Sequence, residues 1–150
     1  MASGIDASTK RILRKVLYAA IEDDEAVFKT QLASFATPAA LMVACGHATD
    51  LAALVFVDKF EGRPTAEAAQ QLADGAAAFA EEWSGIGTAH FAAFINAMFE
   101  GTPIEEVLPA SIAVRVPFVF AGHLLVKFHQ PDEQWFDYLD RLWNTLEDPA

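Results

Sequence analysis

The chain has 150 residues, a length typical of one domain, and 53% of them are hydrophobic. Its 21 acidic residues outnumber its 10 basic residues, which gives a formal net charge of −11 at pH 7. This charge disfavours nucleic acid as a partner, because phosphate binding requires clustered Lys and Arg. The hydrophobic excess leaves three uses open: a large core, an interface between subunits, or an apolar ligand pocket.

The N-terminal sequence and the cysteine content together predict a location. Residues 1–11 contain no apolar run after their basic residues, so they do not resemble an export signal. The single cysteine, Cys45, cannot form a disulfide within the chain. We therefore expect a protein of the reducing cytoplasm. Because its neighbours are small and apolar, Cys45 itself should pack as a buried hydrophobe and not act as a nucleophile.

Residues 8–21 are predicted to form the first helix, with an apolar stripe on one face and basic side chains on the other. Residues 1–21 hold four basic residues against Asp6 alone, a local charge of +3, while the rest of the chain carries −14. We expect this helix to lie against the acidic body or an acidic neighbouring subunit, with an anionic membrane or a nucleic acid as the alternative. The acidic run 22–25 marks a break before a second helix that carries Phe28.

An N-cap threonine followed by Pro38 predicts a third helix that runs to Phe60. Nearly all of this segment is apolar, which is typical of either the central helix of a bundle or a membrane span. His47 and Asp50 lie in its middle, and an Asp at the centre of a bilayer costs about 2.5–3.5 kcal/mol. We therefore expect a buried helix and no membrane span.

Residues that begin and end helices delimit two more helices. Pro64 is predicted to begin a fourth helix, rich in alanine, that ends near Trp83. Thr88 is predicted to cap a fifth helix that ends at Gly101.

Prolines divide the next part of the chain. Residues 102–105, Thr-Pro-Ile-Glu, match a capping box and predict a short helix. Pro109 is expected to end it and to begin another, because the residue before a proline is pushed out of the α region. The segment 109–128 is largely apolar, and Pro117 should kink it. We expect it to be central in the core, together with the helix at 38–60.

Pro131 is predicted to begin the last helix, whose broad aromatic stripe includes Trp135, Tyr138 and Trp143. We expect this helix to close the core or to form an interface between two copies of the chain, because aromatic residues are enriched in interface cores. These three aromatic residues are the candidate interface, and a homodimer is the expected assembly.

A short motif recurs at an offset of 39 residues, as Phe-Glu-Gly-Arg-Pro at 60–64 and Phe-Glu-Gly-Thr-Pro at 99–103. A period near 40 with two helices per unit is typical of helical-hairpin repeats. The alternative is that glycine ends helices and proline begins them, so that the equal spacing is a coincidence. Both interpretations predict an all-α fold, a single domain over residues 1–150 built as a bundle of six to eight helices.

Four polar residues in apolar surroundings form the candidate ligand site: His47, Asp50, Arg115 and His123. His47 and Asp50 lie three residues apart on one helix, a spacing at which a carboxylate accepts a hydrogen bond from an imidazole. Arg115 has apolar neighbours, and a buried Arg needs a carboxylate, for which Asp50 is the candidate. The alternatives are a polar pair that satisfies itself in the core and an Arg side chain that extends to the surface.

No motif predicts a metal, a cofactor or a catalytic reaction. The four histidines form none of the Glu-x-x-His, His-x-x-x-His or His-Glu-x-x-His patterns, and the lone Gly-x-Gly at 85–87 follows no predicted strand. We therefore predict a non-enzymatic acidic interaction protein, such as an adaptor, a regulator or an inhibitor-type module, that binds itself or a protein partner. The alternative is a small-molecule-binding protein or enzyme with an apolar pocket and a polar floor of His47, Asp50 and Arg115.

Overall fold

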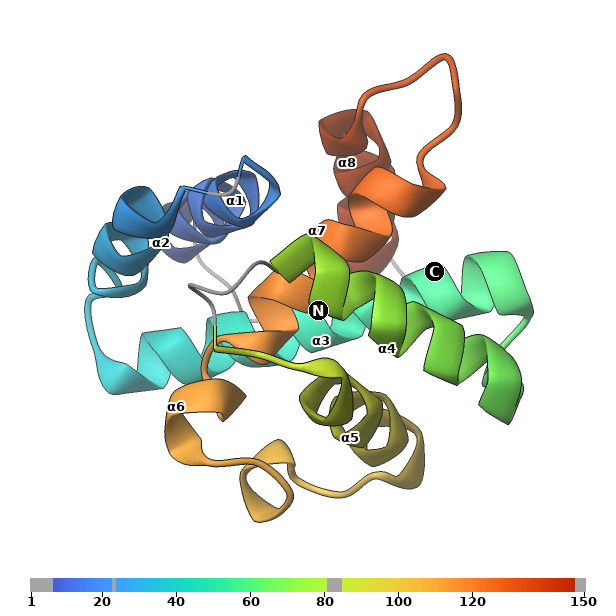
Figure 1. The fold of residues 1–150 in the computed structure, drawn as a ribbon. Coiled ribbons are helices and arrows are strands. Elements are labelled where there is room, and N and C mark those ends of the chain that lie inside the picture. The colour runs from blue at the N-terminus through green and yellow to red at the C-terminus, as the bar shows by residue number, and fades with distance from the viewer. Residues whose placement is uncertain (1–6, 23, 81–84, 148–150) are drawn as a thin grey trace.

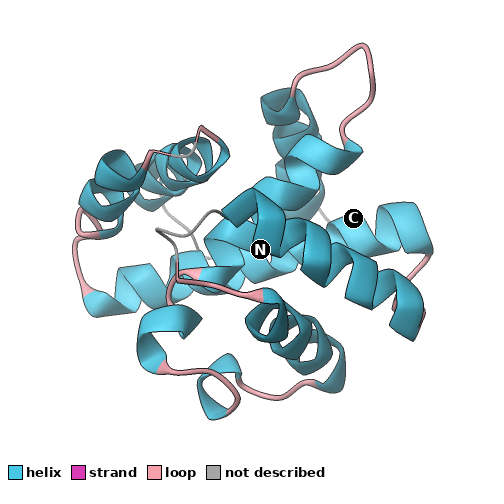
Figure 2. Ribbon diagram, viewed as in Figure 1, coloured by secondary structure: helices cyan, strands magenta, loops and turns pink. Residues whose placement is uncertain are grey.

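The computed structural model describes residues 7–22, 24–80 and 85–147, and all the regular structure in these ranges is helical (Figure 2). The elements in chain order are α1 (Ala7–Ile21), α2 (Glu25–Leu32), α3 (Pro38–Phe60), α4 (Ala66–Ala80), α5 (Thr88–Glu100), the 3-10 turn η2 (Ile104–Glu106), α6 (Ala110–Ala113), α7 (Val116–Phe128) and α8 (Trp135–Glu147). The prediction of an all-α bundle is therefore confirmed.

The central helix of the bundle is α7. Ten consecutive residues, from Val116 to Leu125, are buried, and α1, α3, α4, α5 and α8 all pack against it. Figure 1 shows α7 running through the middle of the molecule, with α3 crossing it at an angle. The buried apolar side chains form one continuous cluster around these two helices, as expected for the two most apolar segments.

Helix α3 begins where the sequence predicts, because Thr37 Oγ1 accepts the backbone N–H of Ala40 at 3.0 Å. One side of the helix packs on α7, and side chains on other sides, such as Val43 and Val57, are exposed. By length and composition alone, α3 and the segment Ala110–Phe128 are the two described helical segments that could span a membrane. Core helices of soluble proteins meet the same criterion.

Pro117 breaks the apolar segment 109–128, where only a kink was expected. Helix α6 ends at Ala113 and α7 begins at Val116, with Pro117 in its first turn. A proline has no N–H to donate to the carbonyl four residues earlier, here that of Ala113, and its ring excludes that carbonyl from the helix. The short α6 therefore leaves the axis of α7 (Figure 1).

Other boundaries also differ slightly from the sequence prediction: α4 begins at Ala66, two residues after Pro64. The N-cap of α5 is Gly87 instead of Thr88, and the Gly87 N–H donates to His90 Nδ1 at 3.0 Å. The short helix predicted from residues 102–105 is the single 3-10 turn η2. The predicted end of α4 near Trp83 lies outside the described residues.

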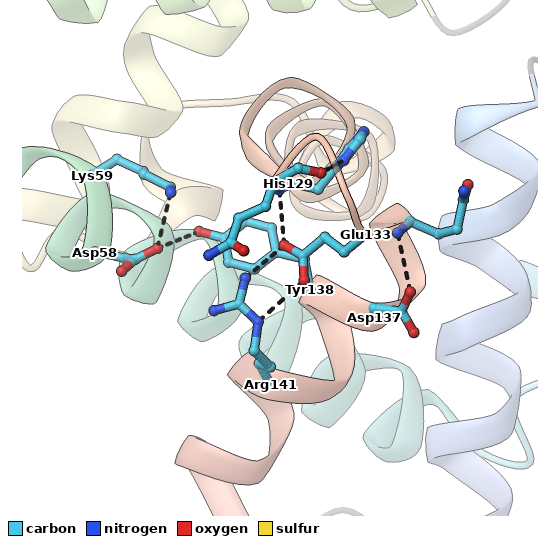
Figure 3. Close-up of polar contacts among 9 residues, drawn as sticks. Asp58, Lys59, His129, Glu133, Asp137, Tyr138 and Arg141 are labelled. Atoms are coloured by element: carbon cyan, nitrogen blue, oxygen red, sulfur yellow. Dashed lines mark hydrogen bonds and ion pairs between the residues drawn. The ribbon is translucent and has the colours of Figure 1, made fainter.

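Helix α8 begins at Trp135, four residues after the predicted start at Pro131. The backbone N–H of Gln134 donates to Asp137 Oδ2 at 3.0 Å, so that a side chain in the first turn caps the helix (Figure 3). A proline followed by acidic residues also suits a turn, and here the turn precedes the helix.

A polar network anchors α8 to α3 (Figure 3). The Tyr138 hydroxyl donates to Asp58 Oδ2 at 2.9 Å, and the Arg141 guanidinium lies 4.9 Å from the centre of the Tyr138 ring. Burial and the hydrogen bond to Asp58 both raise the pKa of Tyr138. Arg141 also donates to Glu133 Oε1 at 2.6 Å, and this hydrogen bond lowers the pKa of Glu133.

Long side chains connect α8 to α1. Arg14 forms an ion pair with Asp140, and the Lys10 ammonium lies 4.7 Å from the centre of the Trp143 ring. The basic face of the first helix therefore covers an acidic and aromatic part of the same chain, as expected for the helix that carries the local positive charge.

The two copies of the Phe-Glu-Gly-x-Pro motif end their helices differently. In the first copy Glu61 has a left-handed conformation with φ 59°, whereas in the second copy Glu100 is still helical and Gly101 is left-handed with φ 71°. The 15-residue α4 follows the first copy and the 3-residue η2 follows the second. The two junctions thus lack the equivalent conformations of a helical-hairpin repeat. The two junctions are close in space, because a guanidinium nitrogen of Arg63 lies 3.9 Å from a carboxylate oxygen of Glu100.

The aromatic stripe of α8 closes the core of its own chain. Tyr138 is 0% exposed and Trp143 is 1% exposed. Trp135 is half-buried, and its neighbour Phe136 is exposed. Of the three predicted interface residues, Trp135 alone offers surface to another chain, because the other two are enclosed by α1 and α3.

We expect Trp143→Ala to lower the free energy of unfolding by about 3–5 kcal/mol, because it empties a filled position of the core. Urea unfolding of the wild type and the variant at two protein concentrations measures this loss. The loss should be the same at both concentrations, and Phe136→Ala on the exposed side of α8 should change stability by less than about 0.5 kcal/mol. A loss that grows on dilution would instead assign Trp143 to an interface.

Candidate functional site

A cavity of about 560 Å³ opens between α3, α5, η2 and α6. In Figure 1, α5 and α6 lie in the lower part of the view, beneath α3. The walls of the cavity are Met42, Cys45, Gly46, Thr49, Asp50, Ala53, Ala97, Met98, Gly101, Thr102, Pro103, Ile104, Glu105, Ala110, Ala113 and Val114. Most of these side chains are apolar, and the volume lies within the range of about 300–1,000 Å³ that small-molecule sites occupy.

Small residues create this space. On α3, Gly46 and Ala53 face the cavity, and on α6 Ala110 and Ala113 do so. A Cβ atom built on Gly46 would meet nothing within 4 Å. A well-packed core would fill such a volume with larger side chains, so the space persists because none of these positions carries one.

Cys45 belongs to the apolar part of the cavity wall. Burial raises the pKa of its thiol to about 12, and the charge of Glu105 adds to this effect. The thiol is therefore protonated at neutral pH, and its Sγ lies 3.8 Å from the carbonyl of Val114. This agrees with the expectation of a thiol that packs as a hydrophobe and does not attack substrates.

Two carboxylates supply the charge of the cavity: Asp50 from α3 and Glu105 from η2. Neither forms an ion pair with any residue that the structure describes. Burial raises the pKa of Asp50. The third polar residue, Thr49, donates its hydroxyl to the carbonyl of Cys45 at 2.9 Å and so satisfies its own helix.

The structure does not bring the four predicted ligand residues together. Asp50 lines the cavity, but His47 is buried on another side of α3, with its ring centre 5.4 Å from that of Trp143. Three residues of an α-helix advance about 300°, so the two side chains diverge by about 60°. The cavity lies on the Asp50 side, and the core lies on the His47 side.

Arg115 and His123 also lie away from the cavity. Arg115 is the N-cap of α7, where its Nε donates to the carbonyl of Ser111 at 2.8 Å and its guanidinium lies beside Gly85. The expected ion pair of Arg115 with Asp50 is not among those that the described residues form, because the break before α7 directs this side chain elsewhere. His123 is buried against α4, with its ring centre 5.2 Å from that of Phe79.

Sequence reasoning missed the residues that define the cavity. Met42, Gly46, Thr49 and Ala53 follow one another at steps of four, three and four residues, so they share one face of α3. Two of these four residues are too small to fill the space in front of them. A face of this kind on an otherwise bulky helix is the signal that could have indicated a cavity.

A second hollow of about 220 Å³ lies between α3 and α8, and is lined by Leu54, Val57, Asp58, Arg141, Leu142 and Thr145. Its charged groups already have partners within the protein, because Asp58 accepts a hydrogen bond from Tyr138 and Arg141 donates one to Glu133. No group of three or more His, Cys, Asp or Glu side chains within the described ranges could hold a metal ion. The larger cavity is therefore the candidate site.

Comparisons of this chain with family models, with curated proteins and with solved structures find no match.

We expect Gly46→Ala to raise the free energy of unfolding by about 0.5–1 kcal/mol, because it removes backbone freedom from the unfolded chain and its Cβ meets open space. Gly75→Ala is the matched control within α4. There the new Cβ would lie 3.3 Å from His123 Nε2, so the gain should be smaller or reversed. Urea unfolding measures both changes, and a loss of stability in Gly46→Ala would contradict an open cavity wall.

Burial, aided by the charge of Lys127, lowers the pKa of His123 from 6.5 to about 4. Between these values the unfolded chain binds a proton that the folded chain does not, so stability falls as the pH falls through this window. Relative to His123→Leu, the wild type should lose roughly 3 kcal/mol between pH 7 and pH 4. Leu125→Val, a buried change on the same helix, should give a difference that does not vary with pH. Parallel pH profiles of wild type and His123→Leu would contradict a buried neutral imidazole.

Proposed function

We propose that this protein is a non-enzymatic binding protein that takes a small apolar molecule into the cavity between α3, α5, η2 and α6. The observation that carries the proposal is the cavity itself: an opening of about 560 Å³ with mainly apolar walls. Transfer of an apolar guest from water into such walls is favourable by roughly 25 cal/mol per Å² of buried apolar surface.

The composition of the cavity walls supports binding over packing. The cavity opens to water, since Met42 and Gly46 in its wall are exposed, and apolar walls left in contact with water lose the stability that burial would give them. Gly46 in the middle of α3 adds to this cost, because glycine destabilises a helix interior. Positions that reduce stability in this way are typical of binding sites, where function and stability oppose each other.

The test is a fluorescence titration with N-phenyl-1-naphthylamine, a neutral dye that becomes bright in apolar surroundings. We expect saturable binding of one dye per chain, and a loss of at least about tenfold in affinity for Gly46→Phe, which places a ring in the cavity. Val43→Phe is the matched control, because Val43 is an exposed residue of α3 that does not line the cavity. Equal dye affinity in the wild type and Gly46→Phe, or no binding by the wild type, would refute the proposal.

A second proposal follows from the exposed aromatic surface where α1 meets the start of α8. Tyr18 is 53% and Phe136 is 42% exposed, and the ring of Trp135 lies within 6.0 Å of both rings. Aromatic residues are enriched in interface cores, so this patch is a candidate surface for self-association. Sedimentation of wild type and of a Tyr18→Ser, Phe136→Ser double variant tests it, and a monomeric wild type would remove it. We also propose a cytoplasmic location, because the single cysteine, Cys45, cannot form a disulfide within the chain. Imaging of a tagged chain in its own cells checks this location.

A further inference from the structure

The charges of the cavity narrow the chemistry of its guest, provided that the cavity is the binding site proposed above. Of the described residues that line it, Asp50 and Glu105 are the only ones that carry charge, and none is Lys, Arg or His. The thiol of Cys45, the other ionisable group, is protonated at neutral pH. The walls therefore combine a large apolar surface with negative charge alone.

The two carboxylates lack the basic partner that some acidic residues of this protein have. Asp140 is paired with Arg14, and Glu133 is paired with Arg141. Asp50 and Glu105 have no such partner among the described residues. Both side chains are exposed, so water solvates their charge in the free protein. An apolar guest that covers them removes this water, and a positive charge on the guest compensates for the loss.

The position of each carboxylate excludes help from the backbone. Asp50 lies in the middle of the 23-residue α3, far from the positive N-terminal end of the helix dipole. Glu105 lies in η2, a single turn with a negligible dipole. Glu105 also contributes to the raised pKa of the Cys45 thiol, so its charge acts inside the cavity.

We propose that the guest is an organic ammonium ion with an apolar body, whose charged nitrogen lies at Asp50 and Glu105 while its body lies against the alanine and methionine walls. A fatty acid or another organic anion would meet like charge and find no basic partner. A bare metal ion would find no group of three ligands among the described residues. An amphipathic amine satisfies both the apolar walls and the carboxylates.

Three ligands of equal chain length test this inference: octylamine, octanol and octanoate, each titrated against protein that carries the neutral naphthylamine dye. We expect octylamine to displace the dye at least about tenfold more tightly than octanol, and octanoate to bind most weakly; tenfold corresponds to roughly 1.4 kcal/mol. The double variant Asp50→Asn, Glu105→Gln should lose the preference for the amine and keep its affinity for octanol. Glu106→Gln is the matched control, because Glu106 is an exposed acid of the same turn that does not line the cavity.

The outcomes separate this inference from the proposed function. If octanol or octanoate binds as tightly as octylamine, the cavity binds small molecules but the charge assignment is wrong. If the double variant keeps the full preference for the amine, the two carboxylates do not hold the nitrogen and the inference is overturned. If the wild type binds neither the dye nor any of the three ligands, the proposed function itself fails.

Discussion

The structure depends on the enclosure of one helix that is apolar on every side. Helix α7 buries its whole surface from Val116 to Leu125, and such a helix is stable in water only if other helices cover it all round. The covering helices are α1, α3, α4, α5 and α8. Pro117 sets where the enclosed rod begins. Because α6 cannot continue along the same axis, it packs against η2 and lines one side of the cavity, opposite residues of α3 and α5.

Local chemistry explains which parts of the fold the sequence could predict. Thr37 caps the start of α3 through its side chain, and Gly101 ends α5 in a left-handed conformation. Both effects involve only neighbouring residues, so both helix ends could be predicted from the sequence. The predicted start of α8 at Pro131 was wrong, because Pro131 begins a turn. The helix begins only at Trp135, where the side chain of Asp137 caps it. Helix α3 ends at Phe60 as predicted, and the left-handed residue that follows is Glu61, although the adjacent Gly62 is of the type that usually takes this conformation.

The candidate site was harder to predict, because the cavity exists where wall residues are small and no large side chain fills the space. Of the four predicted ligand residues, Asp50 lines the cavity, whereas the partners expected for it, His47 and Arg115, do not. Spacing along α3 places His47 and Asp50 within about 60° of each other, and it does not reveal which of them faces the core. Glu105 lies on a separate turn more than fifty residues away, and no local pattern connects it to α3. A cavity is a property of several elements together, so single-helix patterns could suggest it only through small residues such as Gly46.

The contact between α1 and α8 has a consequence for the order of events in folding. Arg14 and Asp140 are 126 residues apart in the sequence, so their pairing closes almost the whole chain into a loop. Closure of so long a loop is entropically costly until the intervening helices have assembled, and contacts of this kind form late. Because long side chains make this contact, we expect local unfolding of the protein to begin with the separation of α1 from α8.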